Sequence, residues 1–518
     1  MNKSFNFQRF IFIIMAFCAG ASVMIVELAA NRILSPLFGN SLFTWTALIG
    51  VILVSMSLGN YLGGKLVDKF PNRKLLKTLL FTAGLSTVMI PGLQNQINQA
   101  YINPNIIWGP ISACLILFSI PGILLGSITP VVIRLVSLTS NDSKIGFSVG
   151  SISAASTLGS VVGTFVTGFV LIPLVGIKSI YFSCGSVLIS LSIVIILMDY
   201  MEKKRLKKAK TISIIFLTFL AFILSDLMSH QVKDSSLLLE DNTFYHRIRI
   251  KTSASEDKKD TILSLFLDSQ FEGAQFEKSK ELPMLCQKYW KLSKIFNTKV
   301  DNALFIGGGA FGMPIALSDY NKDAKVDVVE LDPELIKLGK KYFKLETSSK
   351  VKPIAGDGRV FFHSNKKKYD LIFGDAFHGL ANIPAHLVTK EFFSLVNDSL
   401  TDNGIFMMNI ISSIQGESAL FDSIRKTVNT VFKNVYIFTP QGDLLYGRMN
   451  IILVASNKDI DFKSNALKYL EDKELQIMVQ TFIPSSVYKV DEGQLLTDDH
   501  NPAEYLIAKA LLYNEASY

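Results

Sequence analysis

The pattern of hydrophobic positions divides the chain into two parts of different character. Before about residue 230, six apolar stretches are each long enough to cross a bilayer, which takes about 20 residues. They lie near 10–30, 42–64, 75–93, 106–128, 146–171 and 178–198. A seventh apolar stretch, 211–228, is shorter and contains Asp226. The sequence therefore predicts an α-helical membrane domain of six or seven spans over residues 1–230.

After residue 230 the pattern changes to short runs that are typical of strands. Residues 242–253 alternate polar and apolar side chains, and 260–273 combine apolar runs with β-branched and aromatic residues. A polar turn separates them. These runs predict a small β-unit, and residues 281–298 are expected to form a helix. Together they make a second region, 231–295.

Buried strands and helices alternate from residue 296 onward. Apolar strands are expected at "NALFIGGG", "KVDVVELDP", "KYDLIFGDAF", "GIFMMNII" and "NIILVAS", with helices at "MPIALSDY" and "PELIKLGKKYF". This alternation predicts a Rossmann-like, doubly wound α/β domain over residues 296–518. A ligand of such a domain should bind beyond the carboxyl ends of its strands.

Charge and composition fit a membrane protein better than a nucleic-acid-binding protein. The chain has 52 Lys and Arg against 44 Asp and Glu, a net charge of +8, and its mean hydropathy is +0.34. Much of the positive charge lies in short clusters between apolar stretches, such as 202–210. The four cysteines show neither disulfide nor metal-site spacing. We therefore expect no nucleic acid and no metal.

The distribution of basic loops places the N-terminus in the cytoplasm of a bacterial-type inner membrane. Six spans would leave the second half of the chain in the cytoplasm, and seven would place it outside. The sequence leaves both topologies open, and it leaves homo-oligomerisation open as well.

Candidate ligand-binding residues follow the predicted strands. A glycine turn lets the backbone approach a ligand closely, and its residues are Gly307, Gly308, Gly309 and Gly312. Glu330 can accept hydrogen bonds from both ribose hydroxyls, Asp357 from an adenine amino group, and Asp375 lies beside the reacting part of the ligand. A site with several acids and few basic residues disfavours a pyrophosphate. It favours a cationic nucleoside, S-adenosylmethionine or its decarboxylated form, with no other cofactor.

Two family resemblances follow from these motifs. The stretch "GNYLGGKLVDKFPNRK" resembles the loop between the second and third helices of major facilitator transporters, of which this chain would contain half. Residues 240–410 resemble the spermidine synthase (polyamine aminopropyltransferase) family, in its membrane-fused branch. The motifs that carry this second resemblance are "LFIGGG", "VVELD", "GDGR", "YDLIFGDAF", "IPAHLVTKEFF" and "LTDDHNPAEYL".

The second resemblance implies roles for particular residues. Gln270 would contact the nucleoside or its tail, Glu330 the ribose and Asp357 the adenine, and Asp375 would be the catalytic acid–base residue. His386 is interpreted as structural.

The sequence also departs from the family pattern. The family reads GGGDG at the turn, where the acid holds the substrate amine, and this chain has Ala310. The usual pair of acids is replaced by Asp375 and His378. The tyrosine that positions the amine has no clear match, although Tyr289 is a candidate substitute. Burying a polyamine requires paired carboxylates, so these losses argue against a polyamine acceptor.

The first hypothesis is therefore a lyase. The carboxylate of S-adenosylmethionine would attack its own Cγ and release methylthioadenosine and homoserine lactone, with Asp375 anchoring the α-ammonium and His378 steering the carboxylate. Three alternatives stay open: a polyamine aminopropyltransferase that uses decarboxylated S-adenosylmethionine, a methyltransferase, and a non-catalytic nucleoside-binding transporter or sensor.

Overall fold

The chain forms two compact units, residues 1–234 and 235–518. We call them the helical unit and the α/β unit and describe each by itself. The structure is a computed structural model, and it describes residues 3–38, 42–100, 107–138, 145–203, 234–256, 259–268, 270–296, 298–347, 350–377, 383–440, 448–488 and 493–515.

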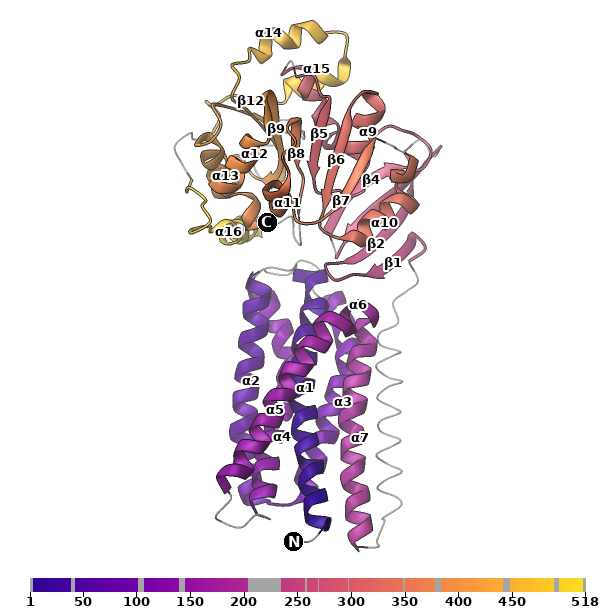
Figure 1. Cartoon of the computed structure of the whole chain (residues 1–518), viewed down its shortest axis with the longest axis vertical. Helices are drawn as coiled ribbons and strands as arrows, with labels where there is room; N and C mark the ends of the chain where they lie inside the picture. Colours follow the sequence, from indigo (N-terminus) through magenta and orange to yellow (C-terminus); the bar gives the residue numbers. More distant parts are fainter. Residues whose placement is uncertain are drawn as a thin grey trace. The chain divides into compact units, whose positions relative to one another are not determined.

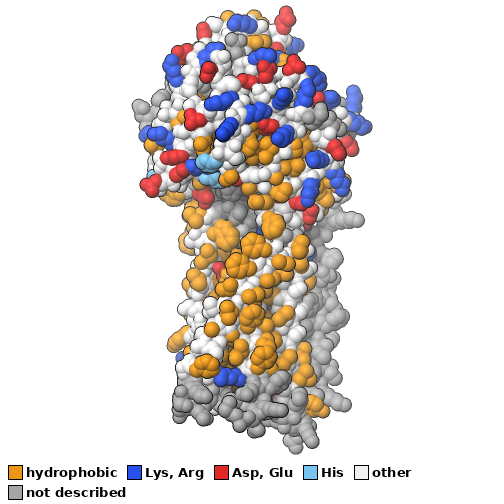
Figure 2. All heavy atoms as spheres, in the orientation of Figure 1, with side chains coloured by type: hydrophobic (Ala, Val, Ile, Leu, Met, Phe, Trp, Pro, Cys, Tyr) orange, Lys and Arg blue, Asp and Glu red, His pale blue; other side chains and the backbone are white. Residues whose placement is uncertain are grey.

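The helical unit consists of long apolar helices (Figure 1). Its elements are α1 (Lys3–Phe38), α2 (Leu42–Lys69), α3 (Arg73–Ala100), α4 (Trp108–Ser137), α5 (Ile145–Val166), a π-helical segment η2 (Thr167–Leu171), α6 (Ile172–Leu174) and α7 (Ile177–Lys203). Six helices are long and apolar enough to cross a membrane, which confirms the six predicted spans. The seventh stretch, 211–228, lies outside the described residues. Apolar side chains cover the visible face of this unit, whereas charged side chains gather on the α/β unit (Figure 2).

Glycines set the distance between the paired helices of this unit. A Cβ atom at Gly159 of α5 would lie 1.9 Å from the Phe17 carbonyl oxygen of α1, and one at Gly59 of α2 would lie 2.2 Å from the Ile123 oxygen of α4. Small residues at such positions let helix backbones approach closely where lipid supplies no hydrophobic drive for association.

The α/β unit begins with a four-stranded antiparallel sheet in the order β1-β2-β3-β4. Its strands are β1 (Leu237–Asn242), β2 (Arg247–Ala254), β3 (Thr261–Leu267) and β4 (Gln270–Phe276). The helix predicted over 281–298 was wrong in type and length, because the described residues of this stretch form a 3₁₀ helix, η3 (Cys286–Lys294). Pro283 disfavours helical geometry at the residue before it, which delays the start.

A second sheet of eight strands forms the centre of the α/β unit, in the order β12-β10-β11-β9-β8-β5-β6-β7 (Figure 1). The strands are β5 (Asn302–Ile306), β6 (Lys325–Glu330), β7 (Val351–Ala355), β8 (Tyr369–Gly374), β9 (Leu400–Ser412), β10 (Asn434–Phe438), β11 (Met449–Ser456) and β12 (Phe482–Ile483). The connecting elements are α9 (Gly312–Tyr320), α10 (Pro333–Tyr342), η4 (Leu345–Thr347), α11 (Gly358–Ser364), η5 (Ala385–Leu387), α12 (Lys390–Asp398), α13 (Ala419–Asn429), α14 (Phe462–Ala466), η6 (Leu467–Tyr469), α15 (Lys473–Gln480) and α16 (Ala503–Glu515). This is the predicted Rossmann-like fold.

The order of the strands positions the candidate residues. Strands β7, β6, β5, β8 and β9 are parallel neighbours, so their carboxyl ends lie along one edge. The chain runs outward from β5 to β6 and β7, and then returns to β8 on the other side of β5. A crevice at such a switch point is where ligands of open α/β sheets bind.

The glycine contacts predict opposite effects for two alanine substitutions in α5. Gly159→Ala should lower the stability of the helical unit by about 1–3 kcal/mol, because the new methyl group overlaps the Phe17 carbonyl. Gly150→Ala should raise stability by about 0.5–1 kcal/mol, because a Cβ atom there meets nothing within 4 Å and alanine favours the helix. Thermal unfolding of the full chain in detergent measures both. Equal effects of the two substitutions would contradict this packing.

Candidate active site

The glycine turn after β5 has almost no room for side chains. Gly307 has φ +96°, and a Cβ atom there would lie 2.3 Å from the Asp375 carbonyl oxygen. At Gly309, φ is +47° and the Cβ atom would lie 3.1 Å from the carbonyl oxygen of Glu272. Gly312 begins α9 directly after Phe311, which is itself left-handed with φ 57°. The turn is therefore enclosed by the backbone of two other segments, the one that follows β8 and strand β4.

Glu330 ends β6 and points at this turn. Its Oε2 accepts a hydrogen bond from the Gly308 N–H at 2.8 Å, and its Oε1 accepts one from the Asp332 N–H at 2.9 Å. Burial raises the pKa of Glu330, although these two N–H groups act to lower it. Each oxygen keeps a second lone pair, so the carboxylate is oriented and can still accept two hydroxyl groups.

Asp357 follows β7 and caps α11. Its Oδ1 accepts hydrogen bonds from the backbone N–H groups of Arg359 and Val360, at 2.9 and 3.0 Å. Its Oδ2 lies 2.8 Å from Nε2 of His386. Burial acts to raise the pKa of Asp357, but the hydrogen bonds from Val360 and His386 outweigh it, and the pKa is lowered. His386 is thus a direct partner of a candidate ligand-binding acid, a contact that the sequence did not reveal.

The chain near its C-terminal end braces the same edge. Asp498 forms an ion pair with the Arg359 guanidinium, and the Asn501 amide donates a hydrogen bond of 2.6 Å to the Ala385 carbonyl. Lys390 N–H donates to the Leu496 carbonyl at 2.8 Å. The motif "LTDDHNPAEYL" therefore acts as a strap that holds the segment containing His386.

Asp375 follows β8, and β8 lies on the opposite side of β5 from β6, the strand that Glu330 ends. Its backbone N–H donates to the Ile306 carbonyl at 2.9 Å, and its Oδ1 accepts a hydrogen bond of 2.9 Å from Nδ2 of Asn409 on β9. Burial raises the pKa of Asp375 to about 6, against the lowering effect of Asn409. Asn409 was missed by sequence reasoning, and the available signal was a polar residue within the apolar run "GIFMMNII".

Cys286 at the start of η3 is close enough to be influenced by this acid. Burial, and then the charge of Asp375, raise the pKa of the Cys286 thiol to about 11. A raised pKa lowers the thiolate fraction of this cysteine at neutral pH.

Glu272 is an acid of this site that sequence reasoning did not find. It lies in β4, two residues after the predicted contact Gln270, which pairs with Leu267 at the hairpin end of the strand. Burial, followed by the charges of Asp375 and Glu330, raises the pKa of Glu272. Cβ atoms at Gly307, Gly308 and Gly309 would meet oxygen atoms of Asp375, Glu330 and Glu272 respectively, so these three acidic residues flank the turn. Asp357 lies beyond the next strand.

Three further residues were expected near the amine or at the catalytic strand end: Ala310, Tyr289 and His378. Ala310 is buried at 3% exposure. Tyr289 was a wrong substitute for an amine-binding tyrosine, because it is fully buried and its hydroxyl bonds to Thr481 Oγ1 at 2.7 Å. His378 lies outside the described residues.

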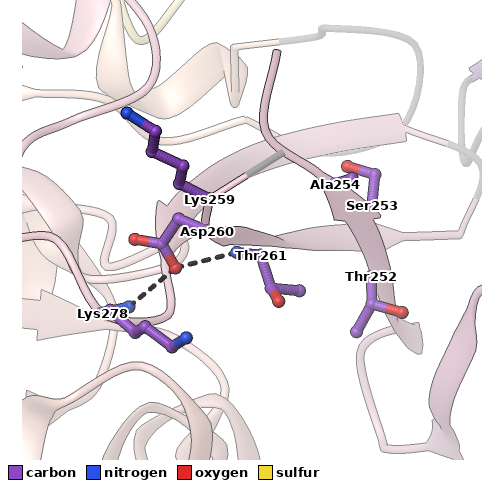
Figure 3. Close-up of a pocket in the computed structure, with 7 residues that line it drawn as sticks. All are labelled: Thr252, Ser253, Ala254, Lys259, Asp260, Thr261 and Lys278. Carbon is purple, nitrogen blue, oxygen red and sulfur yellow. Dashed lines mark hydrogen bonds between the residues drawn. The ribbon is translucent and has the colours of Figure 1, made fainter. Parts of the chain in front are cut away.

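A shallow depression elsewhere in the α/β unit is structural (Figure 3). The Asp260 carboxylate accepts backbone hydrogen bonds from Thr261, Lys278 and Ser279, at 2.8, 3.1 and 2.8 Å. These bonds fasten the ends of β3 and β4. The depression contains none of the candidate site residues.

Comparisons with known proteins agree with this division of the chain. Residues 290–464 match the Spermine/spermidine synthase domain family, and residues 10–239 match the Major Facilitator Superfamily. A polyamine aminopropyltransferase of Vibrio vulnificus is 33% identical over 147 residues, which are 28% of this chain and 48% of that protein. The chain thus spans about half the length of this relative.

Two further proteins resemble the chain. Polyamine aminopropyltransferase 2 of Aquifex aeolicus is 21% identical over 471 residues, 87% of this chain and 89% of that protein. The crystal structure of a probable spermidine synthase from Corynebacterium glutamicum is 20% identical, covers 46% of this chain and 86% of that one, and has a TM-score of 0.40. By the family models, residues 10–239 are similar to the Major Facilitator Superfamily and residues 290–464 to the spermine/spermidine synthase domain.

The geometry of the turn predicts that Gly307→Ala is destabilising. The methyl group would overlap the Asp375 carbonyl at a backbone conformation that L-residues rarely adopt, at a combined cost of about 2–4 kcal/mol. Gly374→Ala is the matched control, because its Cβ atom would make only ordinary contacts of 3.6 Å or more. Chemical unfolding of the full chain in detergent compares the two. Similar stabilities of both variants would refute the role assigned to the turn.

Proposed function

We propose that the α/β unit transfers an aminopropyl group from decarboxylated S-adenosylmethionine to a primary amine and releases methylthioadenosine. The observation that carries this proposal is Asp375, a carboxyl group with a pKa of about 6 that lies beside the glycine turn. Such a pKa suits a general base near neutral pH. The match to the Spermine/spermidine synthase domain and the names of the relatives support the same reaction.

The proposed site residues divide the work of the reaction. The turn Gly307–Gly309 and Glu330 hold the ribose end of the nucleoside, and Asp357 accepts from the adenine amino group. The amine nitrogen attacks the carbon attached to sulfur, and the C–S electron pair leaves with the sulfur as a neutral thioether. Asp375 takes the proton that the nitrogen loses. The sulfonium is already a good leaving group, so the protein mainly aligns the two reactants.

The charge of the site favours the decarboxylated nucleoside over S-adenosylmethionine itself. Glu272, Glu330 and Asp375 flank the turn, and burial, followed by the charges of Asp375 and Glu330, raises the pKa of Glu272. A ligand carboxylate would add a further negative charge to this cluster. An ammonium and a sulfonium would neutralise it.

The lyase that the sequence analysis preferred is now the second candidate. The observation in its favour is Ala310, because the turn lacks the acid that an amine substrate is expected to need. Glu272 supplies a carboxylate on the strand beside the turn, so an amine would still find an acid there. Lyase chemistry would also require the ligand carboxylate to approach the acids of the site.

Product analysis distinguishes these reactions. The full chain in detergent is incubated with S-adenosylmethionine alone, and with decarboxylated S-adenosylmethionine in the presence or absence of putrescine. We expect methylthioadenosine and an equal amount of aminopropylated amine only when decarboxylated ligand and putrescine are both present, and at least a 100-fold loss in Asp375→Asn.

Other products would contradict the proposal. Methylthioadenosine from S-adenosylmethionine alone would identify the lyase, and a demethylated nucleoside would identify a methyltransferase. Nucleoside binding without any product would favour a transporter or sensor.

The contact between Asn409 and Asp375 predicts a shift in pH dependence. The base must be deprotonated, so kcat/KM should fall as the pH drops through about 6. Asn409→Ala removes a hydrogen bond that lowers this pKa, so the acidic limb should move to higher pH by roughly one unit. Asn457→Ala, at an exposed asparagine beyond β11, should leave the limb in place. An unmoved limb in Asn409→Ala would exclude Asp375 as the group that titrates.

A further inference from the structure

An irregularity in the β3–β4 pairing positions the side chain of Glu272. Phe266 pairs with Phe271 and Leu265 pairs with Gly273, so Glu272 is an extra residue without a partner across the ladder. Gly273 has φ +153°. A bulge of this kind turns a side chain away from the direction that strand alternation gives it. The bulge at Glu272 can therefore direct its carboxylate toward the glycine turn.

The same stretch of β4 lies directly against the glycine turn. The Glu272 carbonyl would be 3.1 Å from a Cβ atom on Gly309, and a Cβ atom on Gly273 would be 3.4 Å from the Cβ of Ala310. Gln275 fastens this contact, since its Nε2 donates to the Ala310 carbonyl at 2.7 Å. Glu272 is thus a neighbour of the position at which an amine-binding acid was expected.

Ala310 itself cannot be replaced by an acid without cost. It packs in an apolar cluster that joins β2 and β3 to α10 and the residue after it, and the cluster includes Ile248, Ile250, Leu265, Leu335 and Phe343. A carboxylate there would be buried among hydrocarbon side chains. Ala310 is therefore part of the apolar core, and the adjacent strand β4 carries an acid, Glu272.

Three acceptor atoms near the turn have no donor within the described part of the chain. They are Oε1 of Glu272, Oε1 of Gln287 and Oδ1 of Asn409, all buried. Gln287 is 9% exposed and lies 3.6 Å from a Cβ atom on Gly273, and Asn409 bonds to Asp375. Buried acceptors without donors are costly. A ligand ammonium beside Glu272 would supply the donor that its Oε1 lacks.

We propose that Glu272 anchors the terminal ammonium of the aminopropyl tail of the nucleoside, in place of the acid missing at Ala310. The tail would run from the sulfur, held over the glycine turn, toward β4. The carbon attached to sulfur would then remain accessible from the side of Asp375. Glu272 in this way selects a nucleoside with a cationic tail. The inference rests on the proposed function for the identity of that nucleoside, but its test needs only binding.

Binding of two nucleosides separates the tail from the rest of the ligand. Glu272→Gln in the full chain should weaken decarboxylated S-adenosylmethionine by roughly 10- to 100-fold, the value of one hydrogen bond to a charged group. Methylthioadenosine, which lacks the tail, should bind within about threefold of the unaltered protein. Glu277→Gln, at an exposed position just beyond β4, is the matched control and should leave both affinities unchanged. Calorimetric titration in detergent measures all of them.

The thermal stability of Glu272→Gln distinguishes a structural role of Glu272 from a role in ligand binding. The pKa of Glu272 is raised in the folded protein, so this group stabilises the fold at low pH and loses that contribution as the pH rises through its folded pKa. Glu272→Gln should therefore unfold at an equal or higher temperature than the unaltered protein at pH 7.5, and the difference should close below pH 4.

Three results would overturn the inference. The first is an equal loss of affinity for both nucleosides, and the second is no loss for either. The third is a lower unfolding temperature of Glu272→Gln at pH 7.5. A protein that shows the selective loss but transfers no aminopropyl group would instead contradict the proposed function and leave the role of Glu272 intact.

Discussion

The constraint on which the site depends is the cost of holding several carboxylates together and away from water. Glu272, Glu330 and Asp375 converge on one glycine turn, and burial raises the pKa of each. The turn donates one backbone N–H, that of Gly308, to Glu330, and Asn409 donates one side-chain N–H to Asp375. After burial, the charges of Asp375, Glu330 and Asp268 each act to raise the pKa of Glu272. The arrangement is most stable when a ligand brings positive charge to it.

The fold keeps these acids close despite their repulsion. Glu330 and Asp375 follow β6 and β8, which flank β5 in the parallel part of the sheet. Glu272 comes from the separate β1–β4 sheet, which is fastened to the larger sheet by defined contacts. Thr243 donates to the Asp332 carboxylate at 2.5 Å, and Gln275 bonds to the carbonyls of Ala310 and Phe343. The packing of the two sheets therefore compensates for the repulsion of the acids.

Periodicity was sufficient for the six spans, for the main strands and for the acids at the strand ends, but it predicted a helix over 281–298 where the structure has the shorter 3₁₀ helix η3. Apolar stretches of bilayer length and strands that end in Gly307, Glu330 or Asp375 are local patterns. Glu272 was not predictable in the same way, because a bulge breaks the alternation from which the direction of a strand side chain is read. Asn409 becomes a partner of Asp375 through the pairing of β8 with β9, and His386 becomes a partner of Asp357 because η5 packs beside the start of α11. The sequence shows that position 310 lacks an acid, but it does not show that Glu272 on the neighbouring strand lies beside the turn.

The most direct test of this account is the number of protons released when a cationic ligand binds. Calorimetric titration of decarboxylated S-adenosylmethionine at pH 6, in buffers of different ionisation enthalpy, measures that number. A cationic tail should restore ionisation to carboxyl groups whose pKa is raised, so the protein should release protons, while methylthioadenosine should release fewer or none. Binding heats that do not depend on the buffer, or proton uptake on binding, would contradict the claim that these carboxyl groups ionise when a cationic ligand binds.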